Sequence, residues 1–418
     1  MFALRRYISI TLSFLLALLM LNCAQMPAVR QGVFYSQVRQ PMVAVKLLEG
    51  QKILVSPANN FAIRCFKNGI QIANYFSTAD IEVKVNSSSI IWGQKNQSPM
   101  ESNLSKVIFE PKSKENWLSL NGKRYRGALE IVLDQNKNLL VALNIVNLED
   151  YLKGVVPAEM GKRKKGELEA LKAQAIAART YALSKMGQYD GAYDLKATIY
   201  DQVYAGMDGE ESLVNQAVDE TRGKILTYQD KLIQAYYYAN CGGRTESLEE
   251  VWSGMGEPYL LSVEDRDFCT WAGNYRWEEE WNIKELEHRL FEFLSERESI
   301  DEEDFGRLLD LKILDRAPSG RVKVLLVSTD RGDFTIEKDK IRWALKRTKD
   351  IILPSTLFDL EVTRGIDGSW IRVKAVGKGN GHGIGMCQTG AIGMANRGFS
   401  YSEILAHYYP GTKILKYY

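Results

Sequence analysis

The residue with the clearest chemical potential in this chain of 418 residues is Glu159. It stands just after Pro157, which is expected to end one helix, and just before a second helix, so rigid elements would hold the carboxylate without enclosing it. The neighbouring Val155, Val156 and Pro157 would raise its pKa by desolvation, which suits an acid that donates a proton near neutral pH. The alternative is a plain helix-terminal acid, which the helix dipole stabilises by less than about 1 kcal/mol.

Arg179 is a charge in an apolar setting. Five alanines between Ala173 and Ala182 would let a neighbouring backbone approach closely, which suggests a central helix. The apolar residues there recur every three or four positions, as on one helix face; they are Leu168, Leu171, Ala175, Ala178, Ala182 and Met186. An arginine inside this helix requires an acid or an anionic ligand. An ion pair with Glu149 or Asp150 is one alternative.

A glycine-rich segment near the end of the chain surrounds a single histidine, His382. Seven glycines lie between Gly377 and Gly393. The segment lacks the Gly-Lys-Ser/Thr and GxGxxG patterns of phosphate-binding loops. Glycines spaced in this way let a bulky ligand or another backbone approach closely. By itself, His382 is open to a purely structural interpretation.

Several motifs occur together in one order. They are YLKGVVPAEM, ALKAQAIAARTYAL, YDQVYAG, AYYYANCGGRTES with the following VW and PYL, GHGIGMCQTGAIGMA, and ILAHYYPGT. This series resembles the stage II sporulation protein D family, also called the SpoIID/LytB amidase-enhancer family, over about residues 130 to 418.

The resemblance implies a lytic transglycosylase that cleaves the glycan strands of peptidoglycan and leaves 1,6-anhydro-muramic ends. Hydrolysis of a sugar polymer normally takes two carboxylates, whereas attack by the sugar's own 6-hydroxyl lets one acid donate a proton and later accept one. The resemblance places Glu159 as that catalytic acid. It also assigns Arg179, His382 and Gln388 to substrate binding. No cofactor is implied.

Two other functions remain open. One is a non-catalytic enhancer that activates a separate cell-wall amidase. The other is a lipid-anchored glycan-binding protein whose aromatic side chains stack on sugars; the candidate residues are Tyr236, Tyr237, Tyr238, Trp252 and Tyr259. Neither function needs the Glu159 carboxyl group, so substitution of that residue separates them from the enzyme.

The cysteines do not predict a metal site. Some members of the family bind zinc near the Cys-Gly-Gly turn through a cysteine and a nearby histidine, but here Arg244 follows that turn and no histidine lies close in sequence. We therefore predict no metal. In an oxidising envelope Cys241 and Cys269 are candidates for a disulfide, which spacing alone cannot establish.

The N-terminus predicts export. Arg5 and Arg6 precede an apolar run from Tyr7 to Leu21, which is too short for a stable membrane span and reads as a signal peptide over residues 1–22. Cys23 resembles the cysteine of a bacterial lipobox, although Asn22 departs from the expected small residue. We expect a membrane-anchored lipoprotein of the cell envelope; the alternative is ordinary cleavage near Ala24. A net charge of +2 indicates no nucleic-acid partner.

The remaining pattern predicts an α+β protein with mixed helices and mostly antiparallel strands. Residues 23–40 read as a lipid-anchored tether, 41–146 as a β-rich module, and 147–418 as the SpoIID-like domain. Asn121 and Gly122 separate two alternating runs, which predicts a hairpin because both turn positions favour positive φ.

Overall fold

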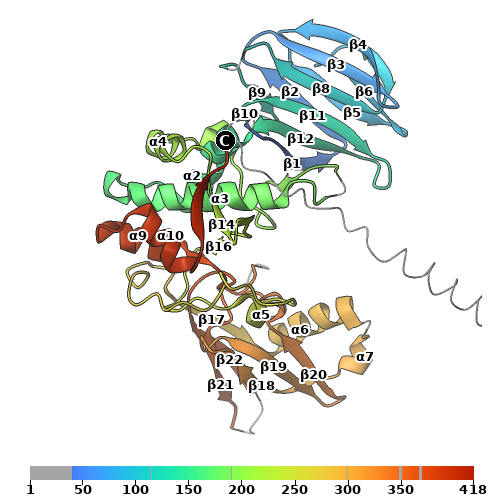
Figure 1. Cartoon of the computed structure of the whole chain (residues 1–418). Coiled ribbons are helices and arrows are strands. Elements are labelled where there is room, and N and C mark those ends of the chain that lie inside the picture. The colour runs from blue at the N-terminus through green and yellow to red at the C-terminus, as the bar shows by residue number, and fades with distance from the viewer. Residues whose placement is uncertain (1–39, 114, 190, 299, 348–350, 367–369) are drawn as a thin grey trace, which may run out of the picture. The chain divides into compact units, whose positions relative to one another are not determined.

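The computed structural model describes residues 40–113, 115–189, 191–298, 300–347, 351–366 and 370–418. The predicted signal peptide, Cys23 and nearly all of the tether lie outside these residues. The fold is α+β with mostly antiparallel sheets, as predicted (Figure 1). Across the described ranges, no helix has both the length and the apolar composition needed to cross a membrane. Residues 40 to 416 belong to one compact unit.

The first part of the chain is β-rich, as predicted, and its strands form two sheets. They are β1 (Met42–Gly50), β2 (Lys52–Pro57), β3 (Phe61–Lys67), β4 (Ile70–Ser77), β5 (Ile81–Asn86), β6 (Ser89–Gln94), β7 (Glu101–Leu104), β8 (Lys106–Pro111), β9 (Leu118–Leu120), β10 (Lys123–Tyr125), β11 (Ala128–Asp134) and β12 (Leu139–Asn147). One sheet has the order β13-β1-β12-β11-β8-β3-β4, with the short β13 (Leu195–Lys196) parallel to β1. The other has the order β10-β9-β2-β5-β6-β7.

Side-chain alternation explains why one face of these strands is buried. In β3, for example, Phe61, Ile63 and Cys65 point into the core and the residues between them do not. The hairpin between β9 and β10 is confirmed: Asn121 and Gly122 have φ of 49° and 89°. Strands β4 and β7 are not predicted from the sequence, because their apolar residues do not alternate clearly. In the structure most of their residues are exposed or only half-buried.

The helical part is built around α3 (Leu168–Lys185), which is buried almost all round from Ala170 to Ala182. It packs on other helices and on strand β14 (Lys224–Tyr228); these helices are α2 (Leu148–Met160), α4 (Ser212–Glu220), α9 (Gln388–Asn396) and α10 (Tyr401–Tyr408). Strand β14 pairs with β15 (Lys231–Leu232) and β24 (Lys413–Lys416). The predicted central helix is therefore confirmed.

Two local predictions were wrong. Pro157 does not end its helix: α2 continues through it to Met160 and stops at Gly161, whose φ of 66° takes the backbone out of the helical region. The largely apolar sequence of residues 231–239 predicts one continuous strand, whereas the structure divides it between β15 and β16 (Tyr237–Tyr238). The backbone N–H of Tyr236 donates to the carbonyl of Gln234, so the chain turns between the two strands.

Residues 276–378 contain a separate hydrophobic core. Its elements are β17 (Arg276–Asn282), α6 (Ile283–Glu298), α7 (Glu302–Phe305), β18 (Leu308–Arg316), β19 (Val322–Thr329), β20 (Asp333–Glu337), α8 (Lys340–Ala344), β21 (Phe358–Arg364) and β22 (Trp370–Lys378). Trp281, Leu290 and Leu325 are among its buried residues. This core is formed by one continuous segment of the chain. After it, β23 (Met386–Cys387) pairs with β16.

Candidate active site

Glu159 lies in the last turn of α2 and is partly buried. Its Oε1 accepts a hydrogen bond of 2.8 Å from the backbone N–H of Val203. Burial raises the pKa of Glu159, while the Val203 N–H and the side chain of Gln388 lower it to a smaller extent. The predicted direction is confirmed, because desolvation outweighs the two groups that favour the carboxylate.

Gln388 is the first residue of α9 and faces the same site. Its side chain is only 6% exposed, and its Nε2 has no hydrogen-bond partner of normal geometry among the described residues. It nevertheless lowers the pKa of Glu159. The amide therefore lies near the carboxylate but does not form a hydrogen bond of normal geometry with it. An unpartnered buried donor of this kind is costly, and a bound ligand would satisfy it.

The segment YDQVYAG, residues 200–206, packs beside Glu159 and binds its carboxyl group. Besides the N–H of Val203, it supplies the fully buried Gln202. The Tyr151 hydroxyl donates to Gln202 Oε1 at 3.1 Å, and Gln202 Nε2 donates to the Tyr237 hydroxyl at 2.8 Å. Burial, and to a smaller extent neighbouring groups that include Glu159, raises the pKa of both tyrosines, so they remain neutral. The sequence indicated Tyr237 only as a candidate for sugar stacking, and it indicated no role for Tyr151, Gln202 or Val203.

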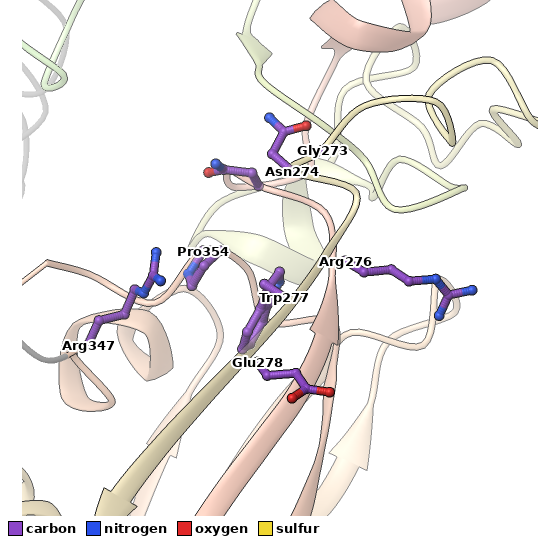
Figure 2. A pocket seen from close by; sticks show the side chains of 8 residues that line it. Gly273, Asn274, Arg276, Trp277, Glu278, Arg347 and Pro354 are labelled. Atoms are coloured by element: carbon purple, nitrogen blue, oxygen red, sulfur yellow. The ribbon is translucent and has the colours of Figure 1, made fainter.

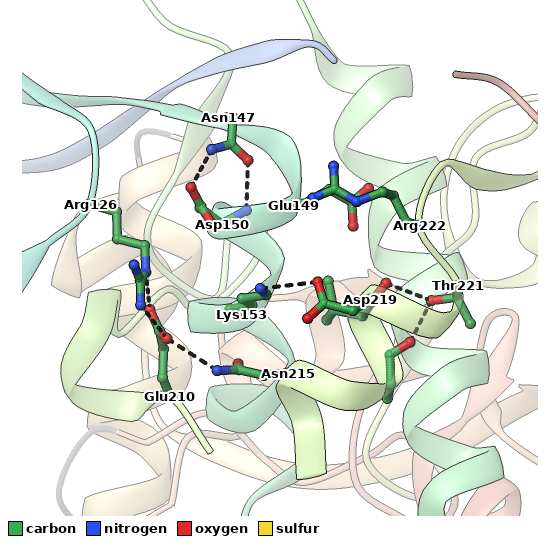
Figure 3. A network of polar contacts seen from close by, with 12 residues as sticks. Arg126, Asn147, Glu149, Asp150, Lys153, Glu210, Asn215, Asp219, Thr221 and Arg222 are labelled. Carbon is green, nitrogen blue, oxygen red and sulfur yellow. Dashed lines mark hydrogen bonds and ion pairs between the residues drawn. The ribbon is translucent and has the colours of Figure 1, made fainter. Parts of the chain in front are cut away.

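The helix that carries Glu159 is fixed at its other end by polar contacts (Figure 3). Asn147 is its N-cap, and the Asn147 side chain accepts the backbone N–H of Asp150 at 2.9 Å. Lys153 forms an ion pair of 3.0 Å with Asp219 on α4. These contacts hold α2 as a rigid support for the carboxylate.

Arg179 does not line an accessible surface. Its side chain is 0% exposed and makes a bidentate pair with Glu149, with N–O distances of 2.8 and 2.7 Å. It also donates to the carbonyl of Lys224 at 3.1 Å. The assignment of Arg179 to substrate binding is therefore corrected in favour of the ion-pair alternative. The physical reason is that the guanidinium is fully buried between α2, α3 and β14, so a glycan strand at the surface could not contact it.

His382 is held by backbone groups on both sides of its ring. Its Nδ1 accepts the N–H of Ile384 at 3.0 Å, so Nε2 carries the proton and donates to the carbonyl of Tyr237 at 3.1 Å. Burial lowers the pKa of His382 to about 4. The ring therefore stays neutral at physiological pH and has both nitrogens occupied. This geometry supports the structural interpretation of His382, which fixes the backbone beside Tyr237.

The aromatic residues proposed for sugar stacking pack largely on one another. Tyr238 and Tyr259 are buried, whereas Tyr236 and Trp252 are half-buried and lie with ring centroids 4.9 Å apart. Trp252 also contacts His382 at a centroid distance of 4.9 Å. Of these five residues, Tyr236, Tyr237 and Trp252 are the ones that are partly exposed and therefore within reach of a sugar.

Two cavities lie elsewhere on the described surface. One, of about 330 Å³, opens at the start of β17 (Figure 2) and is lined by Gly273, Asn274, Arg276, Trp277, Glu278, Arg347, Pro354 and Asn380. The other, of about 610 Å³, adjoins the turn after Glu159 and is lined by Pro157, Ala158, Gly161, Lys162 and residues 208–212. Glu159 does not line either, but the larger one provides open space next to its helix end.

The described cysteines form no disulfide, and three of them converge. Cys241, Cys269 and Cys387 lie with Asp265 in one buried cluster whose ligand atoms are all within 4.8 Å of one another. A metal was not predicted, because no histidine lies close to the Cys-Gly-Gly turn in sequence. The other candidate ligands are distant in sequence, and Cys269 is predicted only as a disulfide partner of Cys241.

A family model described as "Stage II sporulation protein" matches residues 136–228, the part that contains Glu159, Arg179 and Val203. The stage II sporulation protein D of Bacillus amyloliquefaciens is 31% identical over 287 residues, which cover 64% of this chain and 74% of that protein. The chain therefore belongs to the stage II sporulation protein D family.

Other relatives extend the comparison. The amidase enhancer of Bacillus subtilis is 32% identical over 336 residues, covering 73% of this chain and 46% of that protein. An uncharacterized protein of Brachyspira hyodysenteriae is 35% identical over 316 residues, covering 74% of this chain and 77% of that protein. A domain of unknown function, DUF8618, matches residues 269–385, which contain the separate core described above.

Proposed function

We propose that this protein is a lytic transglycosylase that cleaves peptidoglycan glycan strands with Glu159 as its single catalytic acid. The observation that carries the proposal is the environment of this carboxyl group: it is held by a fixed N–H, its pKa is raised by burial, and none of the causes of that shift is a second acid. Membership of the stage II sporulation protein D family and the name of the amidase enhancer support a role at the cell wall.

The proposed chemistry uses one carboxyl group twice, first as a proton donor and then as a proton acceptor. Protonated Glu159 donates its proton to the glycosidic oxygen, and the bond to the anomeric carbon breaks. The resulting carboxylate then accepts the proton of the sugar's 6-hydroxyl as that oxygen attacks the anomeric carbon and closes the 1,6-anhydro ring. Because the Val203 N–H binds Oε1, Oε2 is the oxygen that carries the proton. The unpartnered Nε2 of Gln388 would donate to the substrate beside it.

A second candidate function is enhancement of a cell-wall amidase without catalysis. The name of the Bacillus subtilis relative favours it, although this chain spans only 46% of that protein. In this case the surface around α2 and α9 would bind the amidase, and the raised pKa of Glu159 would have no chemical use. Glycan binding through Tyr236, Tyr237 and Trp252 is a weaker candidate, because these rings are already partly covered.

A product analysis tests the proposed function. The purified protein is incubated with intact peptidoglycan and with glycan strands stripped of peptides by an amidase, and the products are analysed by mass. We expect muramic ends that are lighter than hydrolysed ends by one water, and more of them from stripped strands. Reducing, hydrolysed ends would indicate a second carboxylate. An absence of cleavage, together with a faster amidase in the same mixture, would favour the enhancer.

We also propose that the protein acts outside the cytoplasm as a lipoprotein anchored through Cys23. The expected result is partition into detergent with a mass increase of diacylglycerol size, since acyl chains outweigh the solubility of the folded part. Cys23→Ala should release the protein into the soluble envelope fraction. Recovery of unmodified wild-type protein in that fraction would favour the alternative of ordinary cleavage near Ala24.

A further inference from the structure

Four side chains with metal-binding atoms meet in the interior where three distant segments of the chain converge. Cys241 lies in the Cys-Gly-Gly turn, Asp265 and Cys269 lie just before β17, and Cys387 ends β23. All four residues are fully buried, and their ligand atoms lie within 4.8 Å of one another. Neutral thiols are readily buried, but a carboxyl group is costly to bury without a partner, so the presence of Asp265 among three thiols needs an explanation.

The spacing of the sulfur atoms fits a shared metal ion better than a disulfide. The Sγ atoms of Cys241 and Cys269 are 3.4 Å apart. A disulfide would need about 2.05 Å, whereas sulfur ligands at about 2.3 Å from a tetrahedral Zn²⁺ are separated by about 3.8 Å. Three cysteines and one aspartate also supply the four ligands that a closed structural zinc site requires.

Backbone N–H groups around the cluster point at the sulfur atoms, an arrangement that stabilises thiolates. The Sγ of Cys387 accepts the backbone N–H of Cys241 at 3.2 Å and that of Gly390 at 3.3 Å, and Cys387 is the N-cap of α9. The Sγ of Cys241 accepts the N–H of Gly243 at 3.4 Å. Backbone N–H groups and a helix N-terminus favour a negative charge on sulfur. They form the outer hydrogen-bonding shell that metal ligands need.

Neighbouring groups also orient the carboxyl group of Asp265 and place a positive charge beside the cluster. Asp265 accepts hydrogen bonds from the Tyr408 hydroxyl and from the backbone N–H of Cys269, the latter at 3.0 Å, which fix its orientation. Arg321 is buried beside the cluster and donates to the carbonyl of Cys241 at 2.8 Å. Among the described residues no acid pairs with Arg321, and its Nε and Nη1 have no hydrogen-bond partner. Three thiolates and a carboxylate around a divalent ion carry a net negative charge, which this guanidinium would offset.

We propose that Cys241, Cys269, Cys387 and Asp265 bind a structural Zn²⁺ ion. The ligands differ from a cysteine–histidine set, since none of the four is a histidine. Cys269 and Cys387 stand at the two ends of the segment with the separate core, so the ion closes the base of that segment and ties it to the Cys-Gly-Gly turn. It also fixes the start of α9, where Gln388 follows Cys387 directly. This inference does not depend on the proposed enzymatic activity.

Metal content, thiol chemistry and stability test it on the full chain. We expect one zinc ion per chain by elemental mass spectrometry, and a lower melting temperature after chelation that added Zn²⁺ restores. Replacement by Co²⁺ should give thiolate-to-metal absorption. Cys387→Ser and Asp265→Asn should weaken zinc binding at least ~10-fold, the minimum seen when even outer-shell groups are removed. Cys65→Ser is the matched control: Cys65 is a buried cysteine of β3 that lies outside the cluster, and its loss should leave the zinc content unchanged.

Two results would overturn the proposal. One is purified wild-type protein that holds no zinc, gains none on addition and, after unfolding, titrates Cys65, Cys241, Cys269 and Cys387 as free thiols. The other is a Cys241–Cys269 disulfide, detected as a loss of two hydrogens by mass, in a protein without metal. Because the cobalt spectrum is measured on the wild-type protein, it decides the question even if the cysteine variants fail to fold.

Discussion

Glu159→Gln is expected to abolish formation of 1,6-anhydro ends while leaving the fold and glycan binding intact. Glutamine keeps the size of the side chain and can still accept the Val203 N–H through its carbonyl oxygen, but it has no proton to donate. Loss of a general acid lowers the rate by ~10²- to 10⁴-fold. The measurement is the rate of anhydro-end formation on peptide-free strands, with strand binding measured in parallel.

The control is Glu292→Gln, which removes an exposed acid on α6 and should leave the rate unchanged. The pH profile gives a second check. Since the reaction needs protonated Glu159 and its pKa is raised, wild-type activity should fall as pH rises through that pKa. A Glu159→Gln variant that retains full activity would remove Glu159 from catalysis and leave the enhancer as the better proposal.

Glu159→Gln should also change how the stability of the fold depends on pH. A carboxyl group with a pKa raised by burial binds its proton more tightly in the folded protein than in the unfolded chain. Its favourable contribution is therefore present below the unfolded pKa and is lost as pH rises through the folded pKa. Glu159→Gln should consequently match the wild type in stability below the unfolded pKa and exceed it above the folded pKa, whereas loss of a purely structural contact would lower stability at both.

Arg179→Ala is expected to destabilise the fold by about 3–5 kcal/mol, because it leaves the buried Glu149 carboxylate without its bidentate partner. Denaturant unfolding measures this loss. Activity should decline in step with the folded fraction, since Arg179 does not contact the site. Joint replacement by Arg179→Met and Glu149→Leu should recover most of the stability, because neither charge then remains buried.

Arg124→Ala is the matched control for Arg179→Ala. Arg124 pairs with Asp208 through its Nε at 2.6 Å, but both side chains are substantially exposed. Such a pair contributes about 1 kcal/mol or less. A selective loss of activity in Arg179→Ala without a loss of stability would return Arg179 to the substrate-binding role that family resemblance implies.

Much of the fold was predictable from the sequence because it depends on neighbours a few positions apart. Short alternating runs indicated the β-rich module, and a period of three to four residues identified α3. Asn121 and Gly122 specified their turn through positive φ. The direction of the pKa shift of Glu159 was likewise predictable from the apolar residues beside it in sequence.

The partners of polar side chains were decided only by the tertiary structure. Glu149 or Asp150 were equal candidates for Arg179 until packing brought Glu149 alone against its guanidinium. The Val203 N–H lies 44 positions from Glu159, and Cys387 lies 146 positions from Cys241. No local pattern encodes such pairs, because they exist only where separate elements are held together by a common core. The sequence therefore indicated Glu159 as the candidate acid, whereas the fold alone determined what surrounds it.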